Sequence, residues 1–332
     1  MFTPPAARAT LADGGVVVAL AGAALLGPFN LVETVVERGL ARDPNVASTE
    51  VRHLVENRHG IVHTLVDSAR GDIVFGDGVY DGRVNLDPRT NANRIDRMFY
   101  FAAAAQDARR VLVIGLSAGA WTRLLQGLPN LERIDAVEIN PGYVELIRRY
   151  PAVAPLLDDR RIVVHVDDGR RWLKRHPAER YDLIVMNTSV HWRAYATNLL
   201  SREFLEIARG HLNPGGMITY NGSGSDDAFK TAASVFPHAR RYENFILGWM
   251  SAPDLPPALI ERRLWAISLD GKPIFDPAAE ADRRVVAGIA NRKLVTIAEV
   301  EAASRRKLEI VTDRNMVTEF RHGSAISGAA PH

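Results

Sequence analysis

The chain has 332 residues, no cysteine and a formal net charge of +2. This length suffices for one large domain with an appendage, or for two domains. The lack of cysteine excludes disulfides, thiolate catalysis and cysteine-ligated metals. Because the charges balance and the histidines lack metal-ligand spacing, we expect neither a nucleic-acid partner nor a bound metal.

Residues 14–32 carry no charged side chain, and their number approaches the roughly 20 residues that a membrane-spanning helix needs. Pro28 and Asn30 interrupt this segment, so a buried or interfacial helix fits the pattern equally well. Contact of residues 14–32 with a membrane therefore stays open. We expect the protein in the cytoplasm or on the cytoplasmic face of the inner membrane.

The next segment, residues 46–94, contains short runs of strand-forming residues that glycine and aspartate separate. Such runs predict β-hairpins, and we expect a small hairpin subdomain here. A helix is predicted from Ile95 to Gln106, with Tyr100 in its middle.

Four apolar runs rich in β-branched residues follow, and each predicts a buried strand. They cover residues 110–115, 134–139, 161–166 and 181–186. Each ends in a polar or glycine-rich element, and Asn187 ends the fourth. Because the carboxyl ends of parallel strands form the crevice where open α/β sheets bind ligands, we expect a binding site at these four ends.

The first of these strands opens into the turn Gly115-Leu-Ser-Ala-Gly119. This G-x-S-x-G pattern has Ser117 where a dinucleotide fingerprint has a glycine, which argues against a pyrophosphate ligand. Glu138, near the end of the second strand, offers a carboxylate that accepts hydrogen bonds from the two hydroxyls of a ribose. The pattern favours a mononucleoside such as S-adenosylmethionine.

Further strands are predicted at residues 217–220, 242–249 and 264–269, with a helix at 226–235. This order predicts a seven-stranded sheet with one antiparallel edge strand. Beyond Asp270 the pattern is helical, and Thr296-Ile-Ala-Glu299 predicts a capping box. We divide the chain into residues 1–45, 46–94, 95–270 and 271–332, which are an apolar helix region, a hairpin subdomain, a nucleoside-binding domain and a helical extension.

Taken together, residues 52–269 resemble the spermidine synthase (aminopropyltransferase) family. The segment Gly76-Asp-Gly-Val-Tyr-Asp-Gly82 resembles the family's L-D-G hairpin, and residues 96–100 fall where the family has its Y-H-E helix. The other matching segments, in family order, are residues 56–61, 137–140, 168–169, 181–187, 199–204 and 213–216. Residues 29–33 and 311–319 resemble a divergent, membrane-associated bacterial branch.

The resemblance implies a class I S-adenosylmethionine-dependent transferase fold, of class α/β, with a small N-terminal hairpin subdomain. It also implies S-adenosylmethionine or its decarboxylated form as co-substrate, and a small amine or amino acid as acceptor. The cofactor-binding residues would be Gly115, Ser117, Gly119, Glu138, Asp168 and Gly169. The catalytic residues would be Asn187, Tyr100 and His191, and the substrate-binding residues would be Trp192, Arg193 and Tyr195.

Three departures from the family pattern bear on the chemistry. Ala118 stands where the family has an aspartate that holds the amino group of the cofactor, and Phe101-Ala102 replaces a polar pair. Asn187 replaces the catalytic aspartate, and an amide cannot act as a general base. Since each lost acid also removes attraction for a polycation, these departures argue against putrescine as the acceptor.

The segment 191–195 is the predicted lid of the site. His191 could act as a base near neutral pH, Trp192 or Tyr195 could contact the sulfonium by a cation–π interaction, and Arg193 could pair with a carboxylate. An anionic or zwitterionic acceptor would suit this lid. The alternative for Tyr100 is that it is a core tyrosine without a catalytic role. The alternative for His191 and Arg193 is that they are solvated loop residues.

Three hypotheses about function stay open. The first is three-carbon transfer of the aminopropyl type, which releases methylthioadenosine. The second is methyl transfer on the same fold, which releases S-adenosylhomocysteine. The third is a non-catalytic nucleoside-binding module, which the missing base suggests. The oligomeric state, a homodimer included, is also open.

Overall fold

The structure is a computed structural model that describes residues 50–187 and 197–315. The chain divides into two compact units, Met1–Val51 and Arg52–His332, and the description below concerns the second. The apolar segment 14–32 and the lid residues His191, Trp192, Arg193 and Tyr195 lie outside the described residues. Among the helices of the described ranges, none has the length and apolar character that a membrane crossing requires.

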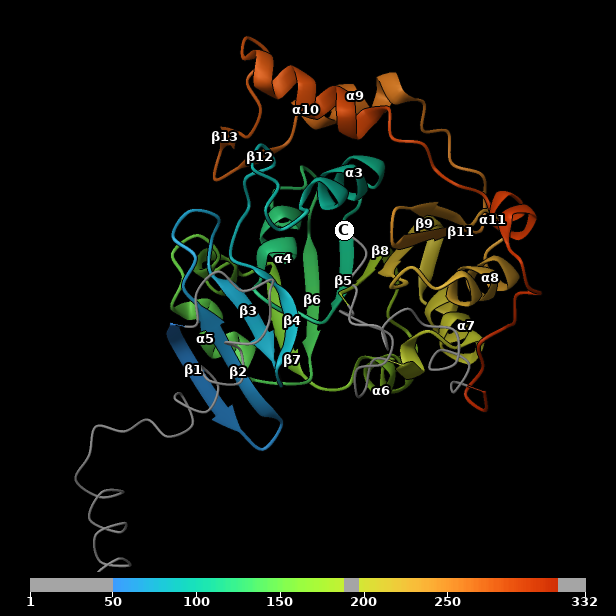
Figure 1. The fold of residues 1–332 in the computed structure, drawn as a ribbon, viewed down its shortest axis with the longest axis horizontal. Helices are drawn as coiled ribbons and strands as arrows, with labels where there is room; N and C mark the ends of the chain where they lie inside the picture. Colours follow the sequence, from blue (N-terminus) through green and yellow to red (C-terminus); the bar gives the residue numbers. More distant parts are fainter. Residues whose placement is uncertain (1–49, 188–196, 316–332) are drawn as a thin grey trace, which may run out of the picture. The chain divides into compact units, whose positions relative to one another are not determined.

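The hairpin subdomain predicted before the main sheet is confirmed. It is a four-stranded sheet in the order β1-β2-β3-β4 (Figure 1). Its strands are β1 (Val51–Asn57), β2 (Gly60–Leu65), β3 (Ile73–Gly76) and β4 (Val79–Arg83). The β3–β4 turn is Asp77-Gly78, and both residues have positive φ, +53° and +75°. That conformation is the two-residue hairpin turn that an Asp-Gly pair favours.

The main sheet has seven strands in the order β10-β11-β9-β8-β5-β6-β7, which confirms the predicted seven-stranded α/β fold; the antiparallel strand, β11, lies one place inside the edge and not at the edge as predicted. Neighbouring strands from β7 to β9 pair in parallel, and β11 pairs antiparallel with β9. The strands are β5 (Arg110–Ile114), β6 (Arg133–Glu138), β7 (Ile162–Val166), β8 (Tyr181–Met186), β9 (Leu212–Asn221), β10 (Arg240–Tyr242) and β11 (Phe245–Trp249).

The last strand of this sheet is not the one predicted at residues 264–269, and that prediction was wrong. Most of that segment lies in helix α9 (Pro257–Trp265) or in the short strand β12 (Ser268–Leu269), which pairs with β13 (Lys272–Pro273). The seventh strand arises instead because the chain turns at Glu243, whose φ is +53°, and splits residues 240–249 into two antiparallel strands.

Alternate side chains of the sheet enter two separate cores. Val111 and Val113 of β5 belong to one core, and Leu112 and Ile114 belong to the other. The first core also contains side chains of α3 (Asp96–Ala104), α4 (Ala120–Leu125), α9 and α10 (Glu280–Ala290). The second contains side chains of α6 (Gly169–Arg175), α7 (Arg202–Gly210), α8 (Asp226–Val235) and α11 (Ile297–Ala303). Both faces of the sheet are therefore covered by helices, which explains the continuous apolar runs in its strands.

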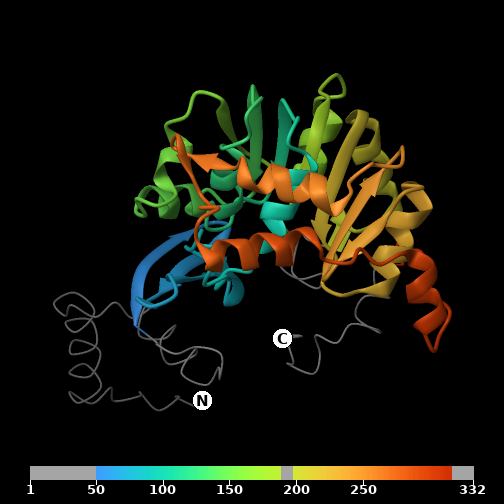
Figure 2. The ribbon, with the colours of Figure 1, turned by 90° about the horizontal axis from the view of Figure 1, so that it is seen from above.

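Helix α10 of the C-terminal extension lies beside α9, and both helices pack on α3 (Figure 2). The capping box at the start of α11 is confirmed, because the Thr296 side chain accepts from the Glu299 N–H while Glu299 accepts from the Thr296 N–H. The short helix α5 (Gly142–Arg148) packs against β2 and joins the hairpin subdomain to the main sheet. The exact domain boundaries given above stay predictions.

Candidate active site

Four neighbouring strands of the main sheet bring the predicted site residues to one edge. The order β8-β5-β6-β7 places Asn187, Gly115, Glu138 and residues 167–169 at successive carboxyl ends (Figure 1). The chain runs from β5 outward to β7 on one side and continues with β8 and β9 on the other. The edge between β5 and β8 is thus the topological switch point, where sheets of this kind bind ligands.

The glycine turn after β5 packs closely against the end of β8. Gly115 has a φ of +87°, and a Cβ at this position would lie only 2.8 Å from the Asn187 carbonyl oxygen. The Asn187 N–H donates to the Ile114 carbonyl at 2.8 Å, so the two strand ends remain paired beyond the strands themselves. Only glycine satisfies both the left-handed backbone and this approach.

The rest of the turn leads into helix α4. Gly119 is its N-cap residue, with a φ of +77°. Ser117 has a φ of +48°, and its hydroxyl donates to the backbone carbonyl of Asp81 in strand β4. The predicted cofactor residue Ser117 thus fastens the hairpin subdomain to the turn. Gly115, Ser117 and Gly119 lie in this one turn, and their contact with a cofactor stays a prediction.

Glu138 lies at the end of β6 and is only 3% exposed. One carboxylate oxygen accepts from the Leu116 N–H at 2.7 Å, and the other accepts from the Asn140 N–H at 2.9 Å. Both bonds come from backbone, so the carboxylate is held rigidly against the glycine turn. A carboxylate only accepts hydrogen bonds, which suits the two hydroxyl donors that a ribose offers.

The Asp168-Gly169 pair after β7 begins helix α6. Asp168 is the N-cap residue, and its carboxylate accepts from the Arg171 N–H at 2.8 Å. Asp167 accepts from the Asp168 N–H at 2.8 Å and pairs with Arg171. A Cβ on Gly169 would lie 2.5 Å from Ile114, so glycine lets the helix start pack on β5. Asp168 therefore has a structural role besides the cofactor contact predicted for it.

Two predicted catalytic residues differ in their placement. Asn187 is partly exposed at the end of β8, beside the glycine turn. Tyr100 is only 3% exposed and lies in the first core, with its ring 4.8 Å from that of Tyr242. Burial raises the pKa of Tyr100 to about 12, so its phenol stays protonated at neutral pH and cannot act as a base. This placement is that of a core tyrosine.

A carboxylate that sequence reasoning did not single out lies beside the same turn. Asp81 of β4 accepts a hydrogen bond from the Tyr143 hydroxyl on α5. Tyr143 is 3% exposed and follows β6 by a few residues. The segment 76–82 was noticed as a family-like hairpin, but only the folded pairing of β3 and β4 shows where the Asp81 side chain lies.

A buried cation lies at the start of α3. Arg97 donates to the Asn244 side-chain oxygen at 2.7 Å and to the Arg94 carbonyl at 2.9 Å. Its guanidinium lies 4.8 Å from the centre of the Phe245 ring. Burial lowers the pKa of Arg97 to about 10, so it keeps its charge at neutral pH. These contacts tie α3 to the end of the sheet.

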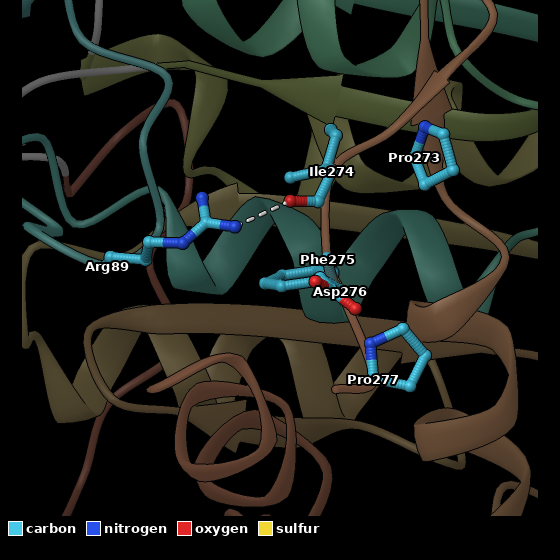
Figure 3. A pocket seen from close by; sticks show the side chains of 6 residues that line it. All are labelled: Arg89, Pro273, Ile274, Phe275, Asp276 and Pro277. Atoms are coloured by element: carbon cyan, nitrogen blue, oxygen red, sulfur yellow. Dashed lines mark hydrogen bonds between the residues drawn. The ribbon is translucent and has the colours of Figure 1, made fainter. Parts of the chain in front are cut away.

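A pocket of about 290 Å³ lies away from the strand ends, against the C-terminal extension. Its walls are Arg89 and residues 273–277, and Figure 3 shows the Arg89 guanidinium directed at the Ile274 carbonyl, 2.9 Å away. Arg89 also pairs with buried Asp282 of α10 at 2.7 Å. This arrangement fastens the extension to the loop before α3.

Within the described ranges, no group of three His, Asp or Glu side chains could hold a metal ion, and the absence of a metal stays a prediction.

Comparison with known proteins gives independent evidence on the family. Residues 98–231 match the model of the spermine/spermidine synthase domain. A polyamine aminopropyltransferase of Agathobacter rectalis is 34% identical over 154 residues, which are 45% of this chain and 49% of that protein. One of Mycobacterium tuberculosis is 29% identical over 201 residues, which are 59% of this chain and 36% of that protein. The chain thus matches about half the length of these relatives or less.

Solved structures support the fold. A spermidine synthase in complex with the transition-state analogue AdoDATO has a TM-score of 0.54 and 14% identity, over 85% of this chain and 88% of that one. The spermidine synthase of Thermotoga maritima has a TM-score of 0.50 and the same identity and coverage. At this identity the likeness shows the fold alone. The domain match and the sequence relatives support a spermidine synthase-like family, with residues 98–231 similar to its spermine/spermidine synthase domain.

Proposed function

We propose that the protein is a transferase of the aminopropyltransferase type. It binds S-adenosylmethionine or its decarboxylated form at the strand ends and transfers a three-carbon group to a small acceptor, releasing methylthioadenosine. The observation that carries this proposal is the pairing of Glu138 with the glycine turn, through the 2.7 Å bond from the Leu116 N–H. This bond holds the Glu138 carboxylate beside a turn that has no phosphate cradle, which supports a nucleoside ligand whose ribose Glu138 would bind.

The reaction is a displacement at the carbon bound to the sulfonium. A lone pair of the acceptor forms the new bond to carbon, the carbon–sulfur bond breaks, and its electron pair neutralises the sulfonium. The leaving group is a neutral thioether, so the protein mainly supplies orientation and a deprotonated nucleophile. The Asn187 amide, at the end of β8, can accept a hydrogen bond from an attacking amine but cannot take its proton.

The acceptor side therefore needs another route for the proton. We propose His191 for this role and Arg193 as the partner of an acceptor carboxylate, with Trp192 or Tyr195 against the sulfonium. All four lie outside the described residues, so their roles rest on the sequence. The cytoplasmic or inner-membrane location of the protein stays a prediction. Whether it forms a homodimer and whether residues 14–32 contact a membrane stay open.

The test is incubation of the purified protein with each of the two donors and a panel of diamines and amino acids. Chromatography then identifies the nucleoside product. Methylthioadenosine supports three-carbon transfer, whereas S-adenosylhomocysteine would establish methyl transfer instead. Tight binding of methylthioadenosine with neither product would establish a binding module. Glu138→Gln should weaken nucleoside binding, because the glutamine keeps the shape of the side chain but has only one acceptor oxygen where Glu138 uses two.

A further inference from the structure

Arg97, at the start of α3, is a buried cation without a carboxylate partner. Its side chain is 9% exposed, and no carboxylate of the described residues lies within 4.0 Å of its guanidinium. Both of its hydrogen bonds go to neutral oxygens, those of the Asn244 side chain and the Arg94 carbonyl. An arginine in the interior of a protein is normally paired, because an uncompensated buried charge is costly.

Part of the Arg97 guanidinium remains available to a ligand. The bond to the Arg94 carbonyl uses Nε, and the bond to Asn244 uses Nη1. The other terminal nitrogen, Nη2, donates to no atom of the described residues, and it is not sealed from solvent. The two terminal nitrogens of an arginine form the fork that binds a carboxylate with two parallel hydrogen bonds. Arg97 can therefore present this fork to an anionic group.

The charged groups that act most on Arg97 do not neutralise it. They are Arg94, Asp96 and Glu243. Glu243 binds two other cations, Arg94 at 2.7 Å and Arg292 at 2.5 Å. Arg292 also lies 3.6 Å from Asp96. This cluster therefore contains three cations and two carboxylates, which leaves one positive charge in excess.

The contacts of Arg97 place it at the end of β9. Asn244, which accepts from Arg97 at 2.7 Å, donates to the Asn221 side chain at 2.8 Å. Asn221 is the last residue of β9, and the parallel register of β8 and β9 makes Asn187 its counterpart on β8. Neighbouring strands lie roughly 5 Å apart. Because β5 and β6 lie on the other side of β8, Arg97 and the predicted nucleoside residues flank Asn187 from opposite sides.

The loop before α3 also reaches the hairpin subdomain and the glycine turn. A Cβ on Gly82 would lie 3.2 Å from the Asn93 side-chain oxygen and 3.6 Å from the Ser117 hydroxyl. The Asn93 oxygen also accepts from the Arg83 N–H at 2.9 Å. The start of α3 therefore borders the turn where the donor is proposed to bind.

We propose that Arg97 binds the carboxylate of the acceptor, and that the acceptor is an amino acid rather than a diamine. A carboxylate would complete the pairing of this buried cation, whereas the second ammonium of a diamine would be repelled. A carboxylate held at the end of β9 leaves the amine of the same molecule on the side of Asn187. This proposal rests on the proposed function, because it assigns the acceptor of the same transfer, but it does not depend on the lid residues.

The test is titration calorimetry of the protein saturated with methylthioadenosine, which needs no turnover. The probes are amino acids, each paired with the amine that lacks its carboxylate: alanine and ethylamine, ornithine and putrescine, histidine and histamine. We expect an amino acid of this panel to bind at least about tenfold more tightly than its amine. Arg97→Met should weaken binding of that amino acid about 10- to 100-fold and change the affinity for methylthioadenosine less than about twofold.

Two further variants test whether the guanidinium itself is responsible. Arg94→Met is the matched control, because it removes the same charge from the start of the same helix, where Glu243 already pairs with that charge at 2.7 Å. We expect its affinities to equal those of the wild type. Arg97→Lys keeps a cation but loses the planar fork, so it should bind the amino acid with intermediate affinity, and it decides the question if Arg97→Met does not fold. Equal losses in Arg94→Met and Arg97→Met would overturn the assignment of Arg97.

The binding readout separates this inference from the proposed reaction. Binding of an amino acid that depends on Arg97 supports the inference even where no transfer product forms. If methylthioadenosine is formed with amines but no amino acid binds better than its amine, the reaction holds and the inference is wrong. If the wild type does not bind methylthioadenosine, both are wrong.

A carboxylate bound by Arg97 could also be that of S-adenosylmethionine, and a comparison of the two donors decides between these sources. If Arg97→Met weakens binding of S-adenosylmethionine but not of its decarboxylated form or of the amino acids, Arg97 binds the donor and the assignment to the acceptor is wrong. If both donors bind the variant as they bind the wild type while the amino acid is lost, the assignment to the acceptor holds.

Discussion

Replacing Gly115 with alanine tests whether the ends of β5 and β8 must lie in contact. The φ of +87° costs an alanine about 1–2 kcal/mol. The new Cβ would lie 2.8 Å from the Asn187 carbonyl oxygen and 3.5 Å from its carbonyl carbon. Both atoms are backbone, so they can move away only if the ends of β5 and β8 separate. Overpacking of this kind costs roughly 1–3 kcal/mol. We therefore expect the free energy of unfolding to fall by about 2–5 kcal/mol.

Gly78→Ala separates the two costs. Gly78 has a φ of +75°, but apart from its own chain neighbours no atom of the described residues lies within 4 Å of the position of its Cβ. Only the conformational cost applies there. Since 1 kcal/mol corresponds to roughly 2 °C in Tm for a large domain, Gly115→Ala should lower Tm by about 2–6 °C more than Gly78→Ala does.

Thermal and urea denaturation measure the stability of both variants, and titration with methylthioadenosine measures the site. Because the strand ends carry the nucleoside turn, Gly115→Ala should weaken nucleoside binding about tenfold or more, whereas Gly78→Ala should leave it unchanged. Equal Tm shifts for the two variants would refute the close-approach argument. Normal nucleoside binding by Gly115→Ala would show that the turn is not part of the site.

Three further predictions follow from other parts of the structure. Asn187→Asp should raise the rate of transfer to an amine by about 10²–10⁴-fold in a product assay, because it supplies a general base at the end of β8; an unchanged rate would place the base elsewhere. Arg89→Ala should destabilise the protein by roughly 2–3 kcal/mol, since it leaves the Asp282 carboxylate buried without its cation. Arg284→Ala, which removes an exposed helical ion pair, should cost less than about 0.5 kcal/mol, and equal costs in urea denaturation would contradict this account. Burial lowers the pKa of His63 from 6.5 to about 4, so the folded state resists protonation; stability should be full above pH 6.5, fall as the pH drops toward 4, and lose this dependence in His63→Phe.

The sequence was sufficient to predict the four central strands and their shared edge. Each contains several apolar residues and ends at glycine, asparagine or a carboxylate, and the side chains of β5, β6 and β8 enter both cores. The error at residues 264–269 has a physical cause. Ile260 and Leu264 are one helical turn apart and both are buried in the first core, so the helical period extends to Trp265. Packing of this helical face in the first core therefore favoured the helix over the strand that the local sequence of residues 264–269 also allowed.

The positions of single side chains were harder to predict than the strands. Asp168 could be recognised as acidic at a strand end, but its cap on the Arg171 N–H depends on where α6 begins. The direction of the Asp81 side chain depends on a bulge, and a bulge shifts the register by one residue without leaving a clear pattern in the sequence. Tyr100 is central in its helix, yet only the packing against Tyr242 shows that it belongs to the core.

The carboxylates of the site fit different tasks, and this division bears on the missing base. Glu138 is buried with both oxygens bound by backbone N–H groups, and the Asp81 carboxylate accepts from the Tyr143 hydroxyl. A base must touch the attacking atom, which approaches the carbon from the side opposite the leaving sulfur. In the proposed function Glu138 binds the ribose, so it does not serve as that base. The proton must therefore leave through the region beyond Asn187, either to a residue such as His191 or directly to solvent from an acceptor that is neutral when it attacks. An acceptor of low basicity, such as an amino acid amine next to an electron-withdrawing group, would react on this scaffold more readily than a diamine that stays doubly protonated at neutral pH.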